Sequence, residues 1–212
     1  MLRPSTFQRL PHSIRTLTTL STNPSIYAHP SPSSIPQQHI LSLLPTSPPT
    51  PNLALGTTTA LPPTTTSFTP NRSFSPILHS VLKQYATQDP AVQMAANAYA
   101  SEAGFTASAK QRGRESQGGS GGAKRGGSVG RGGWVHVSDS RRPPDWGRIS
   151  DPEDIFGSVE VDAEGKFVGE NGNYQDSGTY RMITRDGILG LSPFLMGKLV
   201  ERLKVLEKEA QA

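Results

Sequence analysis

The segment SPFLMGKLVERLKVLEKE, residues 192–209, decides how the C-terminal part of this chain folds. Ser192 is a suitable N-cap and Pro193 suits the first helical position, so a helix is predicted to begin here and to run to about Glu209. Apolar side chains recur every three or four residues and share one face, while lysine, arginine and glutamate cover the other face. The apolar stripe consists of Leu195, Leu199, Leu203 and Leu206, widened by Met196 and Val200.

Upstream of this helix, short apolar stretches alternate with turn residues. Asp162 to Gly165 suits a hairpin loop with a left-handed glycine, and Asp186-Gly187 suits a turn. A helix across such strands predicts an α+β fold, with a small antiparallel sheet of three or four short strands and one C-terminal amphipathic helix. A unit of about 70 residues has a small core, so it is expected to gain stability from a partner. Four strands are expected near residues 156–161, 166–168, 179–184 and 188–191, and the alternating residues 134–137 are a further candidate.

Composition predicts that a long disordered region precedes this unit. Only 33% of the 212 residues are hydrophobic, and the chain contains 19 Pro and 21 Gly. Such a composition leaves little apolar surface to bury. The predicted divisions are a transit peptide at 1–22, a disordered Pro/Ser/Thr-rich linker at 23–75, a helical segment at 76–103, a Gly/Arg-rich flexible linker at 104–133 and the α+β domain at 134–212.

The N-terminal segment has the composition of a mitochondrial presequence. Arg3, Arg9 and Arg15 alternate with apolar and hydroxyl residues, and the first carboxylate in the chain is Asp89. Acid-poor, arginine-bearing leaders are typical of import into mitochondria, and cleavage is expected soon after Arg15. A plastid transit peptide and a plain basic tail are the alternatives. The predicted location is the mitochondrial matrix.

A helical segment follows the predicted linker. Ser75-Pro76 offers a start, Asp89-Pro90 restarts the pattern, and Gly104 is the expected stop. Its apolar face predicts a helix that docks on a partner, or one that packs on the C-terminal part of its own chain.

Ten of the 21 residues in 113–133 are glycine, and arginines are interspersed among them. RGG segments bind RNA through arginine stacking and phosphate contacts, whereas a glycine-rich tract of this kind also serves as a tether. Both interpretations stay open. The candidate RNA-contacting residues are Arg114, Lys124, Arg125 and Arg131.

The sequence offers no recognisable catalytic motif, and no catalytic, cofactor-binding or metal-binding residue is predicted. The chain has no cysteine, which excludes disulfides and thiolate sites. His79 and His136 lack a second ligand at metal spacing. Asp151, Glu153 and Asp154 cluster without the spacing of a calcium loop, so a solvated turn is favoured. An enzyme with an unfamiliar site is a third hypothesis, which requires a pocket with convergent polar groups.

The chain is predicted to act through protein contacts. No apolar run approaches the length of a membrane span, and no small-molecule substrate is evident. The candidate partner-binding residues are Trp146, Phe156, Leu195, Leu199 and Leu203.

The block PPDWGRISDPEDIFGSVEVD at 143–162, then GTYRMITRDGILGLS at 178–192, then the terminal helix, resembles small nuclear-encoded mitochondrial proteins of filamentous fungi. The resemblance covers about a third of the chain. It implies a mitochondrial address and transfers no functional residue. The predicted function is a non-catalytic accessory, assembly or subunit component of a larger mitochondrial complex, such as a respiratory complex or the mitochondrial ribosome. The alternative is an RNA-associated mitochondrial factor.

A fusion of residues 1–30 to a fluorescent protein is expected to enter mitochondria, because its arginines are drawn toward the negative interior. Microscopy with a mitochondrial marker measures this. A fusion with Arg3, Arg9 and Arg15 changed to Gln serves as the control and is expected to stay outside. Cytosolic fluorescence of the unmodified fusion would contradict the predicted address.

Overall fold

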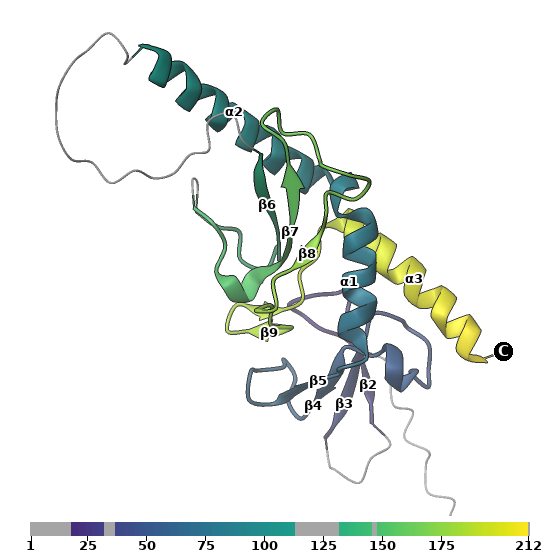
Figure 1. The fold of residues 1–212 in the computed structure, drawn as a ribbon. Helices are drawn as coiled ribbons and strands as arrows, with labels where there is room; N and C mark the ends of the chain where they lie inside the picture. Colours follow the sequence, from purple (N-terminus) through teal and green to yellow (C-terminus); the bar gives the residue numbers. More distant parts are fainter. Residues whose placement is uncertain (1–17, 32–36, 113–131, 146–147, 212) are drawn as a thin grey trace, which may run out of the picture.

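The computed structural model describes residues 18–31, 37–112, 132–145 and 148–211, with α2 described by its backbone alone beyond residue 101. The fold is α+β, with antiparallel sheets and a C-terminal helix (Figure 1). Most of the predicted transit peptide and nearly all of the Gly/Arg-rich tract lie outside the described residues. Among the helices described, none is both long and apolar enough for a membrane crossing.

A five-stranded antiparallel meander forms the N-terminal part, with its strands in sequence order. The neighbouring strands pair in register, as Ala28 does with Leu41 and Thr57 with Thr69. Its elements are β1 (Thr18–Thr19), β2 (Tyr27–Pro30), β3 (His39–Ser42), a short 3-10 turn η1 (Pro51–Leu53), β4 (Gly56–Thr58) and β5 (Phe68–Pro70).

The prediction of a disordered linker at 23–75 is therefore wrong for the described residues of this range. Apolar residues are sparse there, but most of those described point inward: Ile26, Leu41 and Leu55 are completely buried. Threonine favours extended backbone, and prolines occupy loops and strand ends, where no ladder donor is needed. Overall composition could not predict these strands, because it counts apolar residues without recording where along the chain they lie.

The described residues form three α-helices, two directly after the meander and one near the C-terminus. The first two are α1 (Phe74–Tyr85) and α2 (Pro90–Arg112), separated by the 3-10 turn η2 (Ala86–Gln88), and the last is α3 (Pro193–Gln211). The predicted restart is confirmed, because Asp89 Oδ1 accepts a hydrogen bond from the Ala91 N–H at 3.0 Å. The described backbone of α2 extends to Arg112, beyond the stop predicted at Gly104.

Two further sheets lie between α2 and α3 in the sequence. β6 (Gly133–Ser138), β7 (Ile155–Val161) and β8 (Gln175–Asp176) form a three-stranded sheet in that order, and β9 (Ile183–Thr184) pairs with β10 (Gly187–Ile188) as a hairpin. A 3-10 turn, η4 (Pro152–Asp154), leads into β7. Figure 1 shows the three-stranded sheet above the N-terminal meander, with α1 running between them and α3 alongside.

The C-terminal strand predictions are correct in part. β6 and β7 lie where strands were expected, and Gly165 has the left-handed φ of +79° that its loop requires. Phe167 makes only an isolated bridge to Val161, and the strand expected at 179–184 shortens to β9. β8 lies between the strands expected at 166–168 and 179–184, where no strand was predicted.

A single hydrophobic core joins the two parts of the chain. It extends from Leu20 in the meander through Leu78 and Leu82 of α1 to Phe156 of β7 and Leu199 of α3. Residues 134–212 therefore do not form a separate domain with a core of their own, and the single predicted sheet is divided into two. The partner expected to stabilise the C-terminal unit is, in this structure, the N-terminal meander of the same chain.

Leu41→Ala is expected to lower the free energy of unfolding by about 2–5 kcal/mol, because it removes a completely buried side chain. Denaturant unfolding followed by circular dichroism measures this. Leu61→Ala, at a side chain that is 41% exposed, is the matched control and should change stability little. Equal stability of both variants would show that the meander does not fold with the rest.

Candidate functional site

The buried guanidinium of Arg141 is the centre of a buried polar network. Its side chain is only 4% exposed, although arginine is rarely buried without partners. Arg141 Nε donates to Asp154 Oδ1 at 2.7 Å, and Nη2 lies 2.6 Å from the same oxygen. Nη1 lies 3.7 Å from Asp139 Oδ2. Two buried carboxylates therefore compensate one buried cation.

The remaining donors of Arg141 reach backbone carbonyls on both sides of the β9–β10 hairpin. Nη2 donates to the carbonyls of Arg181 at 2.8 Å and Glu153 at 3.0 Å. Nη1 donates to the carbonyls of Met182 at 3.2 Å and Gly187 at 3.4 Å. One side chain thus ties the hairpin to the turn before β7.

Asp139 accepts the complementary set of hydrogen bonds. Its Oδ1 accepts from the backbone N–H groups of Arg141 and Gly190, each at 2.9 Å, and its Oδ2 accepts from the Tyr180 hydroxyl at 2.9 Å. The Tyr180 ring packs on Phe156 with 4.3 Å between centroids, and the Arg141 guanidinium lies 5.4 Å from that ring's centroid. The network is therefore also part of the hydrophobic core.

Burial is the main influence on the pKa values in this network. It raises the pKa of Asp139 from its ordinary value, although Arg141 and the three hydrogen bonds act in the opposite direction. Burial and the nearby Asp139 carboxylate raise the pKa of Tyr180 well above its ordinary value, so this phenol stays protonated. These shifts fit a network that holds structure, with Tyr180 as a permanent donor.

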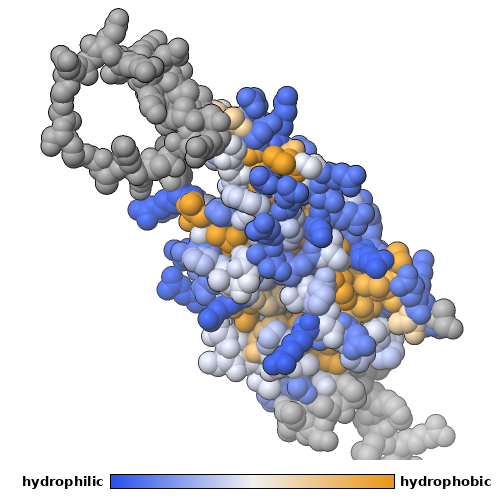
Figure 2. All heavy atoms as spheres, in the orientation of Figure 1, coloured by the Kyte–Doolittle hydropathy of each residue, from blue (hydrophilic) through white to orange (hydrophobic). Residues whose placement is uncertain are grey.

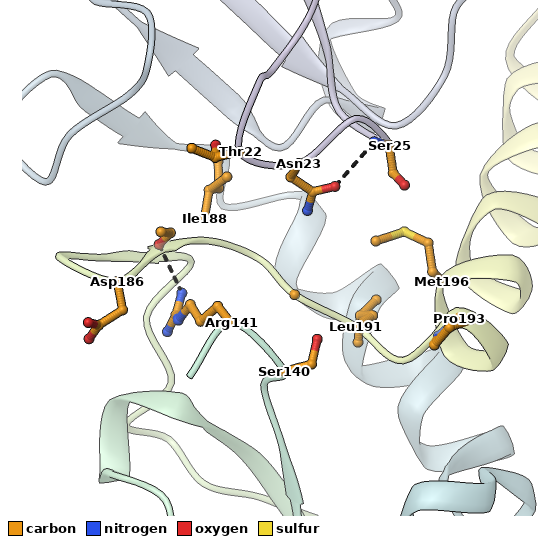
Figure 3. A pocket seen from close by; sticks show the side chains of 12 residues that line it. Thr22, Asn23, Ser25, Ser140, Arg141, Asp186, Ile188, Leu191, Pro193 and Met196 are labelled. Atoms are coloured by element: carbon orange, nitrogen blue, oxygen red, sulfur yellow. Dashed lines mark hydrogen bonds between the residues drawn. The ribbon is translucent and has the colours of Figure 1, made fainter. Parts of the chain in front are cut away.

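A cleft opens beside this network, between the β1–β2 turn and the segment from the β9–β10 hairpin to α3 (Figure 3). We call it the Asn23 cleft; its volume is about 500 Å³. Asn23 crosses its floor, where Nδ2 donates to the Leu189 carbonyl at 2.8 Å and Oδ1 accepts from the Ser25 N–H at 3.2 Å. Asn23 thereby joins the N-terminal meander to the C-terminal part.

The lining of the Asn23 cleft is suited to binding rather than to covalent chemistry. Figure 3 shows hydroxyl side chains of Thr22, Ser25 and Ser140 around it, with Asp186 at one side and Met196 of α3 at the other. The Arg141 side chain that borders it is already bonded within the protein. The cleft offers short polar groups and an apolar wall to a ligand.

A second surface feature runs between α1 and α3, and we call it the α1–α3 groove. Its volume is about 540 Å³. Val205 is 46% exposed there, and the Lys198 ammonium lies 5.4 Å from the centroid of the Tyr85 ring. Figure 2 shows hydrophobic surface along α3. The groove is lined by Ser80, Val81, Gln84 and Tyr85 of α1 and by Lys198, Glu201, Arg202 and Val205 of α3.

The structure changes the interpretation of the predicted partner-binding residues. Phe156, Leu195, Leu199 and Leu203 are each at most 2% exposed and pack inside this chain's own core, so they present no surface to a partner. Periodicity correctly predicted that α3 buries a face but not that α1 and the meander cover it. Trp146, and the candidate RNA contacts Arg114, Lys124, Arg125 and Arg131, lie outside the described residues.

The carboxylates considered for a metal site point in different directions. Asp154 turns inward to Arg141, Asp151 pairs with Arg142 at 3.3 Å, and Glu153 lies 4.0 Å from Arg181. Within the described ranges, no three histidine, aspartate or glutamate side chains gather in a way that could hold a metal ion.

Among the histidines that the structure describes, the two outside the meander each bond to a hydroxyl. His136 Nδ1 lies 2.8 Å from Ser158 Oγ, directly across the β6–β7 pair, and His79 Nδ1 lies 3.1 Å from the Tyr174 hydroxyl. Burial lowers the pKa of both histidines. The His136–Ser158 contact is a cross-strand pair of the kind that stabilises sheets.

Sequence reasoning missed Arg141 and predicted no role for it. Its partners at Arg181 and Gly187 lie 40 and 46 residues away, so no local spacing signals them. The nearby Asp139 was the one local signal, since an acid two residues before an arginine can pair with it.

Comparisons with known proteins found no matching family model, no similar curated protein and no similar solved structure.

Gly190→Ala is expected to destabilise the protein by about 1–3 kcal/mol. A Cβ there would lie 2.7 Å from Asp139 Oδ1 and 2.8 Å from the backbone nitrogen of Arg141. Gly197→Ala is the matched control: it faces open space in α3 and should stabilise by about 0.5–1 kcal/mol. Thermal and denaturant unfolding measure both. A harmless Gly190→Ala change would mean that the Asp139 contacts are not as tight as described.

Proposed function

We propose that this protein is a non-catalytic accessory subunit of a larger assembly in the mitochondrial matrix, and that it binds a partner protein through the α1–α3 groove. The observation that carries this proposal is the exposed apolar residue Val205 beside the cations Lys198 and Arg202. The presequence composition supports the address. Respiratory complexes and the mitochondrial ribosome are the assemblies considered.

The occupant proposed for the groove is an acidic amphipathic helix of the partner. From Lys198 to Val205 the groove follows about two turns of α3, a length of about 10 Å, which suits two turns of a docked helix. Val205 and Tyr85 would contact its apolar side chains. The apolar contact supplies most of the affinity, and the charges at the rim select the partner.

The charges at the rim favour an acidic partner. The one acid that lines the groove, Glu201, is already paired with Lys198 at 3.0 Å. Within the part of the chain that the structure describes, Arg202 has no carboxylate partner within salt-bridge distance. Hydrogen bonding to Glu201 raises the pKa of Lys198, so this ammonium remains charged. The rim therefore carries one uncompensated positive charge.

The test uses the full-length protein, tagged at its C-terminus and expressed in its native host organism. Gentle lysis of isolated mitochondria is followed by native size fractionation and mass spectrometry of the co-purifying proteins. The expected result is co-migration with one dominant complex. Arg202→Glu/Val205→Glu should release the protein from it, while Met94→Glu, at a 72% exposed side chain of α2, should not.

Each outcome has a distinct meaning. A free monomer under gentle lysis would contradict the subunit role. A complex that persists in the groove variant would contradict the groove but not the role. RNase treatment tests the alternative: loss of the complex after RNase, with the groove variant still bound, would favour an RNA-associated factor that uses the Gly/Arg-rich tract.

A further inference from the structure

A pocket on the other side of the β9–β10 hairpin has an apolar floor. It lies between the β5–α1 connection and β9, and its volume is about 430 Å³. The floor is formed by Phe68 and Pro70 of β5 and by Tyr180, Met182 and Ile183. Tyr180 contributes its ring rather than its hydroxyl, because the hydroxyl donates to Asp139. This is the size and character of a small-molecule site; we call it the Arg72 pocket.

Two arginines, Arg72 and Arg181, also line the Arg72 pocket, and its lining contains no carboxylate. Within the described residues, Arg72 has no acidic side chain at salt-bridge distance. The contact between Arg181 and Glu153 is long, 4.0 Å, and the Arg181 side chain is 73% exposed. An exposed pair of this length contributes little, so both guanidinium groups remain available to an anion.

We propose that the Arg72 pocket binds a small amphiphilic carboxylate, with its apolar body on the floor and its carboxylate on the arginines. Guanidinium groups bind carboxylates through paired, charge-assisted hydrogen bonds. A medium-chain fatty acid has this chemistry. A neutral molecule of the same shape would leave the arginines without a partner, and an anion without an apolar body would leave the floor exposed to water.

The hairpin that forms one wall of this pocket is held by the Arg141 network. Arg141 donates to the carbonyls of Arg181 and Met182, both of which line the pocket. The wall is therefore fixed before a ligand arrives, which lowers the entropy lost on binding. This site is separate from the α1–α3 groove and does not depend on the proposed partner.

The test is isothermal titration of decanoate into the purified full-length protein, with decanol as the neutral counterpart. Decanoate is expected to bind at one site, and Arg72→Gln/Arg181→Gln should weaken binding at least tenfold. Arg185→Gln is the matched control, because Arg185 is a 78% exposed neighbour that does not line the pocket. Ile183→Thr should weaken decanoate binding by reducing the apolar floor.

Thermal unfolding verifies that each variant is folded, which is expected because Arg181 is exposed and neither arginine belongs to the core. Equal affinity for decanoate and decanol, equal affinity of the wild type and the double arginine variant, or no binding of decanoate at all would overturn the proposal. Arg202→Glu/Val205→Glu should bind decanoate as the wild type does, so failure of the groove and failure of this pocket are distinguishable.

Discussion

The burial of one arginine constrains the C-terminal half of this protein. Removing a guanidinium from water costs several kcal/mol, and that cost is recovered only when charge and hydrogen bonds are both compensated. Arg141 achieves this with Asp139, Asp154 and four backbone carbonyls. Because these carbonyls belong to the β9–β10 hairpin and to the turn before β7, a change in the hairpin's position would leave buried donors unsatisfied. The hairpin is therefore fixed by electrostatics, although its two strands are too short to fix it by pairing.

The same hairpin separates the two pockets of this region. Asp186, Gly187 and Ile188 face the Asn23 cleft, whereas residues 181–183 face the Arg72 pocket. Both pockets also need the N-terminal meander for their opposite walls. A further long-range contact ties the two parts of the chain together: the Ser192 hydroxyl donates to Asp89 Oδ2 at 2.7 Å and accepts from the Leu195 N–H at 3.1 Å, which joins the N-termini of α2 and α3. Both pockets therefore form only when the N-terminal and C-terminal parts pack together in the common core.

Local features of this fold were predictable from sequence, and long-range ones were not. The Ser192 cap, the stripe on α3, the restart at Asp89 and the left-handed Gly165 each depend on neighbouring residues, and all are present. The meander was missed because its proline and threonine content resembles a linker, while its strands are only two to four residues long. The Arg141 network could not be predicted, since its members come together only after folding. Periodicity also could not tell whether Leu199 faces a partner or its own chain.

The N-terminal boundary of the fold bears on the proposed import. β1 spans Thr18–Thr19, and Leu20 is 4% exposed in the common core, so the described part of the fold already includes residues only a few positions after Arg15. Cleavage shortly after Arg15 would leave β1 complete, whereas cleavage near residue 22 would remove an edge strand and a buried leucine. The predicted end of the presequence at 22 is therefore less compatible with the fold than an end before Thr18. A processing site before Thr18 would leave every described strand of the meander in the processed chain.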